Sequence, residues 1–361
     1  MLYKENWDKA KERLTALWEN EIIDRCCISI TVPKDGSVYE AIDHAEPGIE
    51  ESLSLYYTDP ETVLERNLQK FENTAYLGEA LPCVFPDFGT GGHAMYFDCK
   101  YEFAQDTIWM FPIIHDWEKD TLAFNSRNEM LLAEKALIKQ LAALGKNKFF
   151  VSMPDNCGSM DALAHLRGSD KLLLDMLEEP DQVKASVKKL ITVLKSTGNE
   201  FYDFIRENSG GGSTHGWMHL WANGKMAQLQ CDLSVMISSG MYEEFVLPEL
   251  EETVNWLDYS VYHLDGQEQI RHLEMLLSIK KLNMIQWTPV AGQPPTSTFI
   301  PVLKKIQQAG KGLVLIPQPW EVESLLSELS PKGLQLVVNG IGTKAEAEEL
   351  IKKVEIWSRR K

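Results

Sequence analysis

The sequence predicts a (β/α)₈ barrel that forms a single domain over residues 1–361. Short apolar runs with the length of strands alternate with helical segments along most of the chain, and about eight such units can be counted, which is the number in this barrel. Strands separated by helices pair in parallel through helical crossovers. A chain of 361 residues with 44% hydrophobic content is also long enough to bury the core of such a fold.

An open, doubly wound sheet shows the same alternation of strands and helices. Such a sheet carries a glycine-rich phosphate-binding turn after its first strand. Here the first strand runs into Val32-Pro33-Lys34-Asp35-Gly36, which does not match that turn. We therefore prefer the barrel.

The elements follow in order from local signals. A helix is expected over 4–20, and Thr58-Asp59-Pro60 predicts the start of another that runs to Tyr76. Residues 95–125 resemble an irregular insertion, and Pro248 should kink a helix over 239–258. The other helices are predicted at 127–144, 158–178, 181–208, 267–278, 296–309, 321–329 and 343–358. The strands are predicted at 26–33, 81–87, 148–155, 213–221, 260–265, 282–288, 312–317 and 334–339.

Composition excludes several classes of function. The formal net charge is -17, from 36 Lys+Arg against 53 Asp+Glu, and no basic cluster suits a nucleic-acid partner. No apolar run reaches the length of a membrane span, and residues 1–20 lack the apolar core of a signal peptide. The six cysteines include no C-x-x-C pair, which is typical of reduced thiols. We expect a soluble, cytoplasmic protein that acts on a small molecule.

Polar residues end nearly every predicted strand. In a (β/α)₈ barrel the working site lies at the carboxyl ends of the strands, so these residues are expected to meet there. A barrel packed only for stability would not need them. The strand-end residues are Asp87, Asp155, Asn156, His219, Trp221, His263, Asp265, Gln286, Gln318 and Asn339.

His263 and Asp265 are the most informative pair. They end the strand over 260–265 and point to the same side, because side chains alternate along a strand. Such a pair can hold a metal, relay a proton or bind a substrate. The alternative is an aspartate that caps the next helix beside a core histidine. His215, deeper in its strand, is expected to have a core role.

The chain resembles the uroporphyrinogen decarboxylase superfamily, most strongly from about 226 to 310. The matching features are Cys231-Asp232-Leu233-Ser234-Val235-Met236-Ile237-Ser238, Phe245-Val246-Leu247-Pro248 and Tyr262-His263-Leu264-Asp265-Gly266. The resemblance implies a single (β/α)₈ barrel. The branches of this superfamily are decarboxylases of a cyclic tetrapyrrole and zinc-dependent methyltransferases that pass methyl groups between corrinoid proteins and thiols.

The sequence departs from both branches. The decarboxylases hold propionate groups with an Arg-Gln-Ala-Gly-Arg run after the first strand, and no arginine lies in Ile30–Gly36 here. The methyltransferases bind zinc through His-x-Cys and a cysteine near the last strand. His263 matches the histidine, Asp265 replaces the first cysteine, and Asn339-Gly340-Ile341-Gly342 lacks the second.

We therefore expect a methyltransferase-like enzyme that moves a methyl group between a small methylated substrate or thiol and a corrinoid carried by a partner protein. A divalent metal, Zn or Fe, would be held by His263 and Asp265, with His219 or Cys231 as the third ligand. Asp87 or Asp155 would act as acid/base or substrate anchor. The expected substrate-binding residues are Trp217, His219, Trp221, Gln286, Trp287 and Asn339.

Two alternatives remain open at this point. A metal-free carboxy-lyase acting on another acid would use Asp87 to handle the proton, with Asp265 binding the substrate. A non-catalytic barrel would keep the pocket and only bind a ligand.

Overall fold

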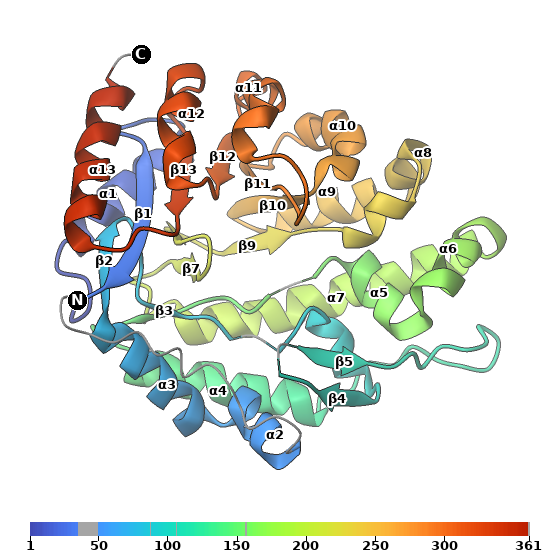
Figure 1. The fold of residues 1–361 in the computed structure, drawn as a ribbon. Coiled ribbons are helices and arrows are strands. Elements are labelled where there is room, and N and C mark those ends of the chain that lie inside the picture. The colour runs from blue at the N-terminus through green and yellow to red at the C-terminus, as the bar shows by residue number, and fades with distance from the viewer. Residues whose placement is uncertain (35–49, 87, 106, 156, 360–361) are drawn as a thin grey trace.

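The computed structural model describes residues 1–34, 50–86, 88–105, 107–155 and 157–359. Its centre is a seven-stranded sheet in the order β2-β1-β13-β12-β11-β10-β9 (Figure 1). Neighbouring strands are parallel except for β1 and β2, which are antiparallel. The strands of this sheet are β1 (Cys27–Pro33), β2 (Thr74–Gly78), β9 (Met226–Leu229), β10 (Tyr259–Asp265), β11 (Met284–Thr288), β12 (Gly312–Leu315) and β13 (Leu334–Val338).

Shorter strands form three further pairs. Strands β3 (Cys83–Val84) and β6 (Phe150–Val151) are parallel, whereas β4 (Tyr101–Phe103) with β5 (Ile108–Met110) and β7 (Ser213–His215) with β8 (Leu220–Ala222) are antiparallel. The backbone N–H of Met153 donates to the carbonyl of Thr214 at 3.2 Å, so β7 follows β6 in space. The fold is thus the expected α/β type with a mostly parallel sheet. Closure into a barrel and the single-domain division stay predictions.

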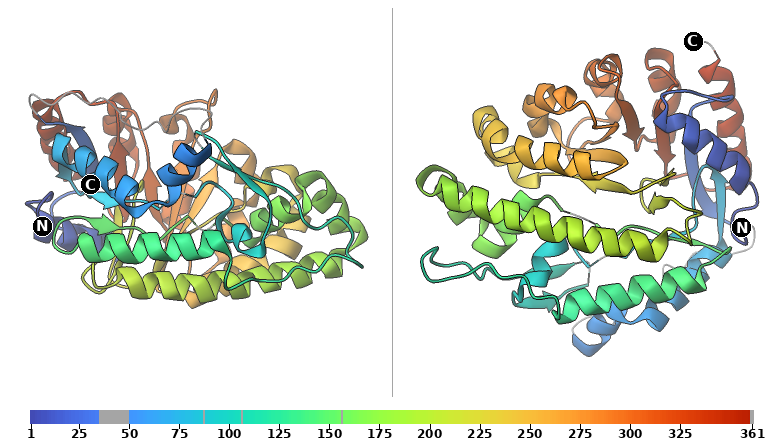
Figure 2. Two further views of the ribbon diagram at one scale, coloured as in Figure 1. Left: turned by 90° about the horizontal axis from the view of Figure 1, so that it is seen from below. Right: turned by 180° about the vertical axis from the view of Figure 1, so that it is seen from behind.

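Helices cover one face of the sheet. In Figure 1 the helices α10 to α13 lie along strands β10 to β13, and Figure 2 shows α4 and α7 side by side. No helix within the described ranges is long and apolar enough to cross a membrane. The α-helices are α1 (Trp7–Trp18), α2 (Glu50–Thr58), α3 (Pro60–Asn73), α4 (Glu129–Leu144), α5 (Ser159–Arg167), α6 (Ser169–Glu178), α7 (Pro180–Ile205), α8 (Ser239–Met241), α9 (Leu247–Trp256), α10 (Leu273–Ser278), α11 (Ile300–Gln308), α12 (Val322–Glu328) and α13 (Lys344–Ser358).

Single-turn or tightly wound segments connect several elements. The 3₁₀ segments are η1 (Gly92–Phe97), η2 (Asp232–Met236), η4 (Gln267–His272), η5 (Thr296–Phe299) and η6 (Pro319–Glu321). A π-helical segment, η3 (Tyr242–Val246), lies between α8 and α9. Pro248 lies two residues after it, in the first turn of α9, and its missing N–H accounts for the disturbed helix that the sequence predicts there.

The predicted strand over 213–221 is wrong. The segment folds back on itself as the β7–β8 hairpin, and His219 in its turn has a positive φ of 50°. The alternation of His215, Trp217 and Trp221 resembled one strand face, but the turn reverses the chain between them. The strand that joins the central sheet before β10 is β9, which the sequence analysis did not predict.

Other boundaries also differ from the predictions, among them the strands over 81–87 and 148–155, which are shortened to β3 and β6. Helix α3 ends at Asn73, and the following residues form β2 rather than continuing the helix to Tyr76. The helical region predicted over 158–178 is divided at Gly168, whose φ of 90° no helix can contain. The expected insertion over 95–125 contains the β4–β5 hairpin.

The core consists of two clusters on opposite faces of the sheet. Alternate strand residues such as Ile28, Leu264 and Leu313 join the larger cluster with helices α10 to α13. The residues between them, including Val261 and Met284, pack against α1 and the β7–β8 hairpin. By strand alternation, His263 and Asp265 lie on the face of Val261.

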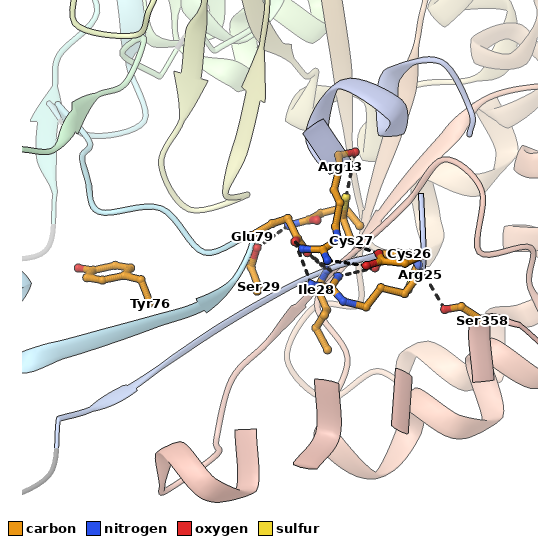
Figure 3. A network of polar contacts seen from close by, with 12 residues as sticks. Arg13, Arg25, Cys26, Cys27, Ile28, Ser29, Tyr76, Glu79 and Ser358 are labelled. Carbon is orange, nitrogen blue, oxygen red and sulfur yellow. Dashed lines mark hydrogen bonds and ion pairs between the residues drawn. The ribbon is translucent and has the colours of Figure 1, made fainter. Parts of the chain in front are cut away.

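A buried carboxylate ties together the elements near the start of β1 (Figure 3). Glu79 is fully buried and accepts hydrogen bonds from Arg25 at 2.6 and 2.9 Å, from Arg13 at 3.2 Å and from the backbone N–H of Ile28 at 2.8 Å. Its neighbour Gly78 approaches the backbone so closely that a Cβ there would lie 1.9 Å from the carbonyl oxygen of Ile28. Helix α1, strand β1 and the end of β2 are thereby held at the amino-terminal end of β1, away from His263 and Asp265.

We predict that Glu79→Gln destabilises the protein by about 3 kcal/mol, because it leaves the buried Arg25 guanidinium without its opposite charge. The free energy of unfolding in urea measures the effect. The control is Glu355→Gln, which removes an exposed pair with Arg359 and should change stability by less than about 0.5 kcal/mol. Equal effects of the two substitutions would contradict the prediction.

A second prediction concerns Glu134 of α4, which is buried and accepts a hydrogen bond from the Tyr96 hydroxyl. Burial raises the pKa of this carboxyl to about 7 from a usual 4.5, and the Tyr96 bond opposes the rise. The folded state therefore binds the proton more tightly, and stability is lost as pH rises from 4.5 through 7. Glu134→Gln should remove this loss. Its free energy of unfolding relative to that of wild type should therefore rise by up to about 3 kcal/mol as the pH goes from 4 to 8.

The measurement is urea unfolding of both proteins across that range. Glu129→Gln is the matched control, because Glu129 also accepts from a tyrosine, Tyr101, but at an exposed position. A difference between Glu134→Gln and wild type that does not change with pH would contradict the prediction.

Candidate metal centre

Three side chains that can ligate a metal meet at the carboxyl ends of β9 and β10. Asp232, His263 and Asp265 each offer a ligand atom, and these atoms all lie within 4.8 Å of one another. Tyr262 pairs with Leu229, the last residue of β9, and Asp265 and Asp232 each follow this pair by three residues. The register of the parallel strands therefore assembles the group.

The end of β10 is fixed by Gly266. This residue has a φ of 78°, and its N–H donates to the Thr288 carbonyl at 2.9 Å. A Cβ on Gly266 would meet side-chain atoms of Gln293, Glu268 and Val290 at 3.3 Å. The chain turns here into η4, so Asp265 is the last strand residue, at the edge of the sheet.

The imidazole of His263 is oriented by a neighbour on β11. Gln286 lies opposite His263 in the register and is fully buried. Its amide N–H donates to the Thr288 hydroxyl, which leaves its oxygen to accept from Nδ1 of His263. The Nδ1–H tautomer that follows leaves Nε2 with a free lone pair, as metal-ligating histidines require.

Trp217 closes one side of this histidine. The two rings meet edge to face with centroids 5.7 Å apart, and Trp217 makes a similar contact with His215 at 5.1 Å. The half-buried tryptophan thus shields His263 from water on that side and restricts the rotation of the imidazole.

Asp232 is held by side chains from the chain just before it and from α5. Gln228 donates to Gln230, and Gln230 donates to a carboxylate oxygen of Asp232 at 3.0 Å. The buried Asp161 accepts from the backbone N–H groups of Asp232 at 2.8 Å and Leu233 at 2.9 Å. Asp161 thereby caps the amino-terminal end of η2 and fixes the backbone from which Asp232 projects.

Further contacts fix the rest of η2. Gln269 donates to the Cys231 carbonyl at 3.3 Å, and Nε2 of His272 binds the Ser234 carbonyl at 3.0 Å. Both residues belong to η4, the turn that follows Asp265. The η2 turn that carries Asp232 and the η4 turn that follows Asp265 therefore support each other.

The electrostatics of the group favour a cation. Partial burial raises the pKa of Asp232, and the nearby Asp265 charge adds to the rise, while His263 and Gln230 oppose it. Burial also raises the pKa of Asp161 to about 7, and Asp232 contributes to this rise. Two ligand carboxylates and a third acid close together repel one another, and a bound divalent ion would relieve that repulsion.

The structure brings four of the predicted site residues together: His263, Asp265, Gln286 and Trp217. Asp155 is half-buried after β6 and is not one of the three possible ligands. Asp87 and Asn156 lie outside the described residues.

The remaining predicted residues lie elsewhere, for reasons of strand geometry. His219 sits in the β7–β8 turn, where Nδ1 accepts from the Leu81 N–H at 3.1 Å. Cys231 is fully buried, and burial raises the pKa of its thiol. Cys231 and Trp287 both point to the helix-covered face, because each neighbours a residue that points to the site. Trp221 packs in the core against Trp7, and Asn339 is exposed beyond β13.

Sequence reasoning missed Asp232 as a site residue. A signal for it was present, since Gln228, Gln230 and Asp232 alternate with apolar residues in the period-two pattern of a strand. Strand β9 was not predicted because the hairpin residues just before it gave a stronger pattern.

Comparisons with known proteins support the fold. The sequence matches no protein-family model, and no curated protein matches it either. Among solved structures, a methyltransferase from Methanosarcina mazei superposes with a TM-score of 0.62 and 12% sequence identity, covering 96% of this chain and 98% of that chain. At this identity the likeness establishes a shared fold over nearly the full length of both chains.

The capping contact of Asp161 generates a prediction. Asp161→Asn keeps the size of the side chain but sets an amide N–H against one of the two backbone N–H groups of η2. We expect zinc affinity to fall about tenfold, as for other residues that orient ligands. Asp181→Asn, at the first turn of α7, is the control and should bind zinc as wild type does.

Calorimetric titration of zinc into the three proteins measures the effect, and thermal unfolding is recorded alongside it. Loss of stability in Asp161→Asn with unchanged zinc affinity would show that Asp161 is purely structural.

Proposed function

We propose that this protein is a metal-dependent, methyltransferase-like enzyme. In this proposal Asp232, His263 and Asp265 hold a divalent metal, and a small thiol or methylated substrate exchanges a methyl group with a corrinoid carried by a partner protein. The observation that carries the proposal is the convergence of these three ligand atoms within 4.8 Å at the carboxyl edge of the sheet.

The donor set fits a metal of the expected kind. One imidazole nitrogen and two carboxylate oxygens suit zinc or Fe(II), and three protein ligands leave a position open for a substrate. When bound, such an ion acts as a Lewis acid that stabilises the thiolate or alkoxide form of a substrate. The same set accounts for the missing cysteines of the resembled methyltransferases, since Asp265 stands at one cysteine position and Asp232 adds a ligand.

The residues of this chain have separate roles in the proposal. Gln286 keeps Nδ1 of His263 protonated, so Nε2 is available as a ligand. Gln230 and Asp161 keep the Asp232 carboxylate aimed at the other two ligands. Trp217 excludes water beside His263, which strengthens the electrostatic interactions of the group.

The methyl-transfer step rests on the resemblance of the sequence and on the shared fold with a methyltransferase. The position of the three-residue group supports it further, because sheets of this type place their working sites at the carboxyl ends of the strands. The open edge beyond β9 and β10 is also where a partner protein would have to deliver its corrinoid.

The test combines metal binding with methyl transfer. Wild-type protein should bind one zinc or Fe(II) ion in calorimetry, and the zinc form should transfer the methyl group of free methylcobalamin to 2-mercaptoethanol, followed by the change in corrinoid absorbance. His263→Ala should lose at least tenfold in metal affinity and most of the transfer rate. Asp232→Asn should behave similarly.

His115→Ala, at an exposed position outside the group, is the matched control and should resemble wild type. Equal weak metal binding by wild type, His263→Ala and His115→Ala would refute the metal centre. Tight metal binding without any methyl transfer would refute the assigned reaction and leave the metal centre in place.

A further inference from the structure

A cavity of about 310 Å³ lies directly beside the three-residue group. It is bounded by α5, the start of α6 and the η2 turn, and it shares Asp232 with the candidate metal centre. This volume is at the small end of ligand pockets and suits a molecule of a few non-hydrogen atoms. The residues used below are Asp161, His165, Ser169, Asp232, Leu233 and Met236.

The charge of the lining is one-sided. Asp161 and Asp232 contribute carboxyl groups, and no lysine or arginine lines the cavity in the described part of the chain. His165 adds no positive charge at neutral pH, because burial lowers the pKa of its imidazole, against the effect of a bond to the Thr90 backbone. Arg271 binds the Val235 carbonyl of the same turn, but it is not part of the lining.

The remaining lining divides into a polar and an apolar part. Ser169 and His165 offer a hydroxyl and an imidazole, whereas Leu233 and Met236 offer apolar surface. A small alkyl chain with a hydroxyl or ammonium end would satisfy both parts. A carboxylate, sulfonate or phosphate end would face the two aspartates without a cation to bind it.

We propose that this cavity binds the tail of the substrate and selects uncharged or cationic tails over anionic ones. The proposal rests on the proposed function, in which the reacting end of the same substrate reaches the group of Asp232, His263 and Asp265. The η2 turn links the two sites, since Asp232 belongs to both and Leu233 lines the cavity next to it.

The first experiment tests the cavity without any metal. Metal-free protein with labelled methionine methyl groups is titrated with n-propylammonium, 1-propanol and propionate, three probes of one length. The Met236 methyl resonance should move with the first two probes, and propionate should bind at least tenfold more weakly. The methyl of Met153, which is buried elsewhere, is the internal control.

Ser169→Lys places a cation at an exposed position of the lining and should reverse the order, so that propionate binds better than n-propylammonium. Ser196→Lys, at an exposed position of α7, makes the same change in net charge and should leave the order unchanged. Propionate binding to wild type as tightly as n-propylammonium would overturn the proposal, as would an order that Ser169→Lys does not change.

The second experiment joins the cavity to the metal centre. Zinc-loaded wild type and Ser169→Lys are titrated with cysteamine, 2-mercaptoethanol and 3-mercaptopropionate. Comparing each thiol between the two proteins removes the intrinsic differences among the thiols. Ser169→Lys should strengthen the binding of 3-mercaptopropionate and weaken that of cysteamine, each by at least threefold, with a smaller change for 2-mercaptoethanol.

The two experiments separate the two proposals. Failure to bind zinc, together with the expected order of the propyl probes, would refute the proposed function and retain the selectivity of the cavity. Zinc and thiol binding with no response to Ser169→Lys would refute the cavity as the tail site and retain the metal centre.

Discussion

The hydrogen-bond register of β9, β10 and β11 is the constraint on which the candidate site depends. It sets His263 opposite Gln286, and it directs the two chains so that Asp265 and Asp232, each three residues beyond the last pair of β9 with β10, come together with His263. A shift of one residue in either pairing would turn a ligand toward the helix-covered face, because side chains alternate along a strand. The buried apolar residues on both faces make such a shift unfavourable, so the packing of the core also protects the geometry of the site.

Stability and proposed activity are placed at opposite ends of the strands. At the amino-terminal end of β1, the fully buried Glu79 is balanced by Arg25 and Arg13, and each charge has a partner (Figure 3). At the carboxyl ends of β9 and β10, like charges gather instead: burial and the Asp232 charge raise the pKa of Asp161, and burial and the Asp265 charge raise the pKa of Asp232. The first arrangement stabilises the fold. The second costs stability, and such clusters of like charge occur where a function such as cation binding uses them.

Asp232 and His263 are held in place by different kinds of contact. The histidine is oriented by one buried side chain on the next strand, whereas the aspartate depends on Gln230 and on Asp161 from a distant helix. Helix α5 is in turn held by Glu249, which binds the N–H of Met160 at 3.2 Å. The position of this one carboxylate therefore depends on contacts among α5, α9 and η2, so substitutions far from the group should alter its affinity for metal.

The sequence by itself determined the class of fold and the most informative pair. Alternating apolar runs and helices indicated the parallel sheet, and strand alternation put His263 and Asp265 on one face. Both inferences use interactions between residues close in the chain. Only the tertiary structure decided the third member of the group, because Asp232 reaches it through strand pairing across more than thirty residues. The tertiary structure also decided that His219 and Trp221 lie away from the expected site. A residue with positive φ inside an apparently regular strand pattern reverses the chain there. The packing of the resulting hairpin against α1 cannot be read from local periodicity.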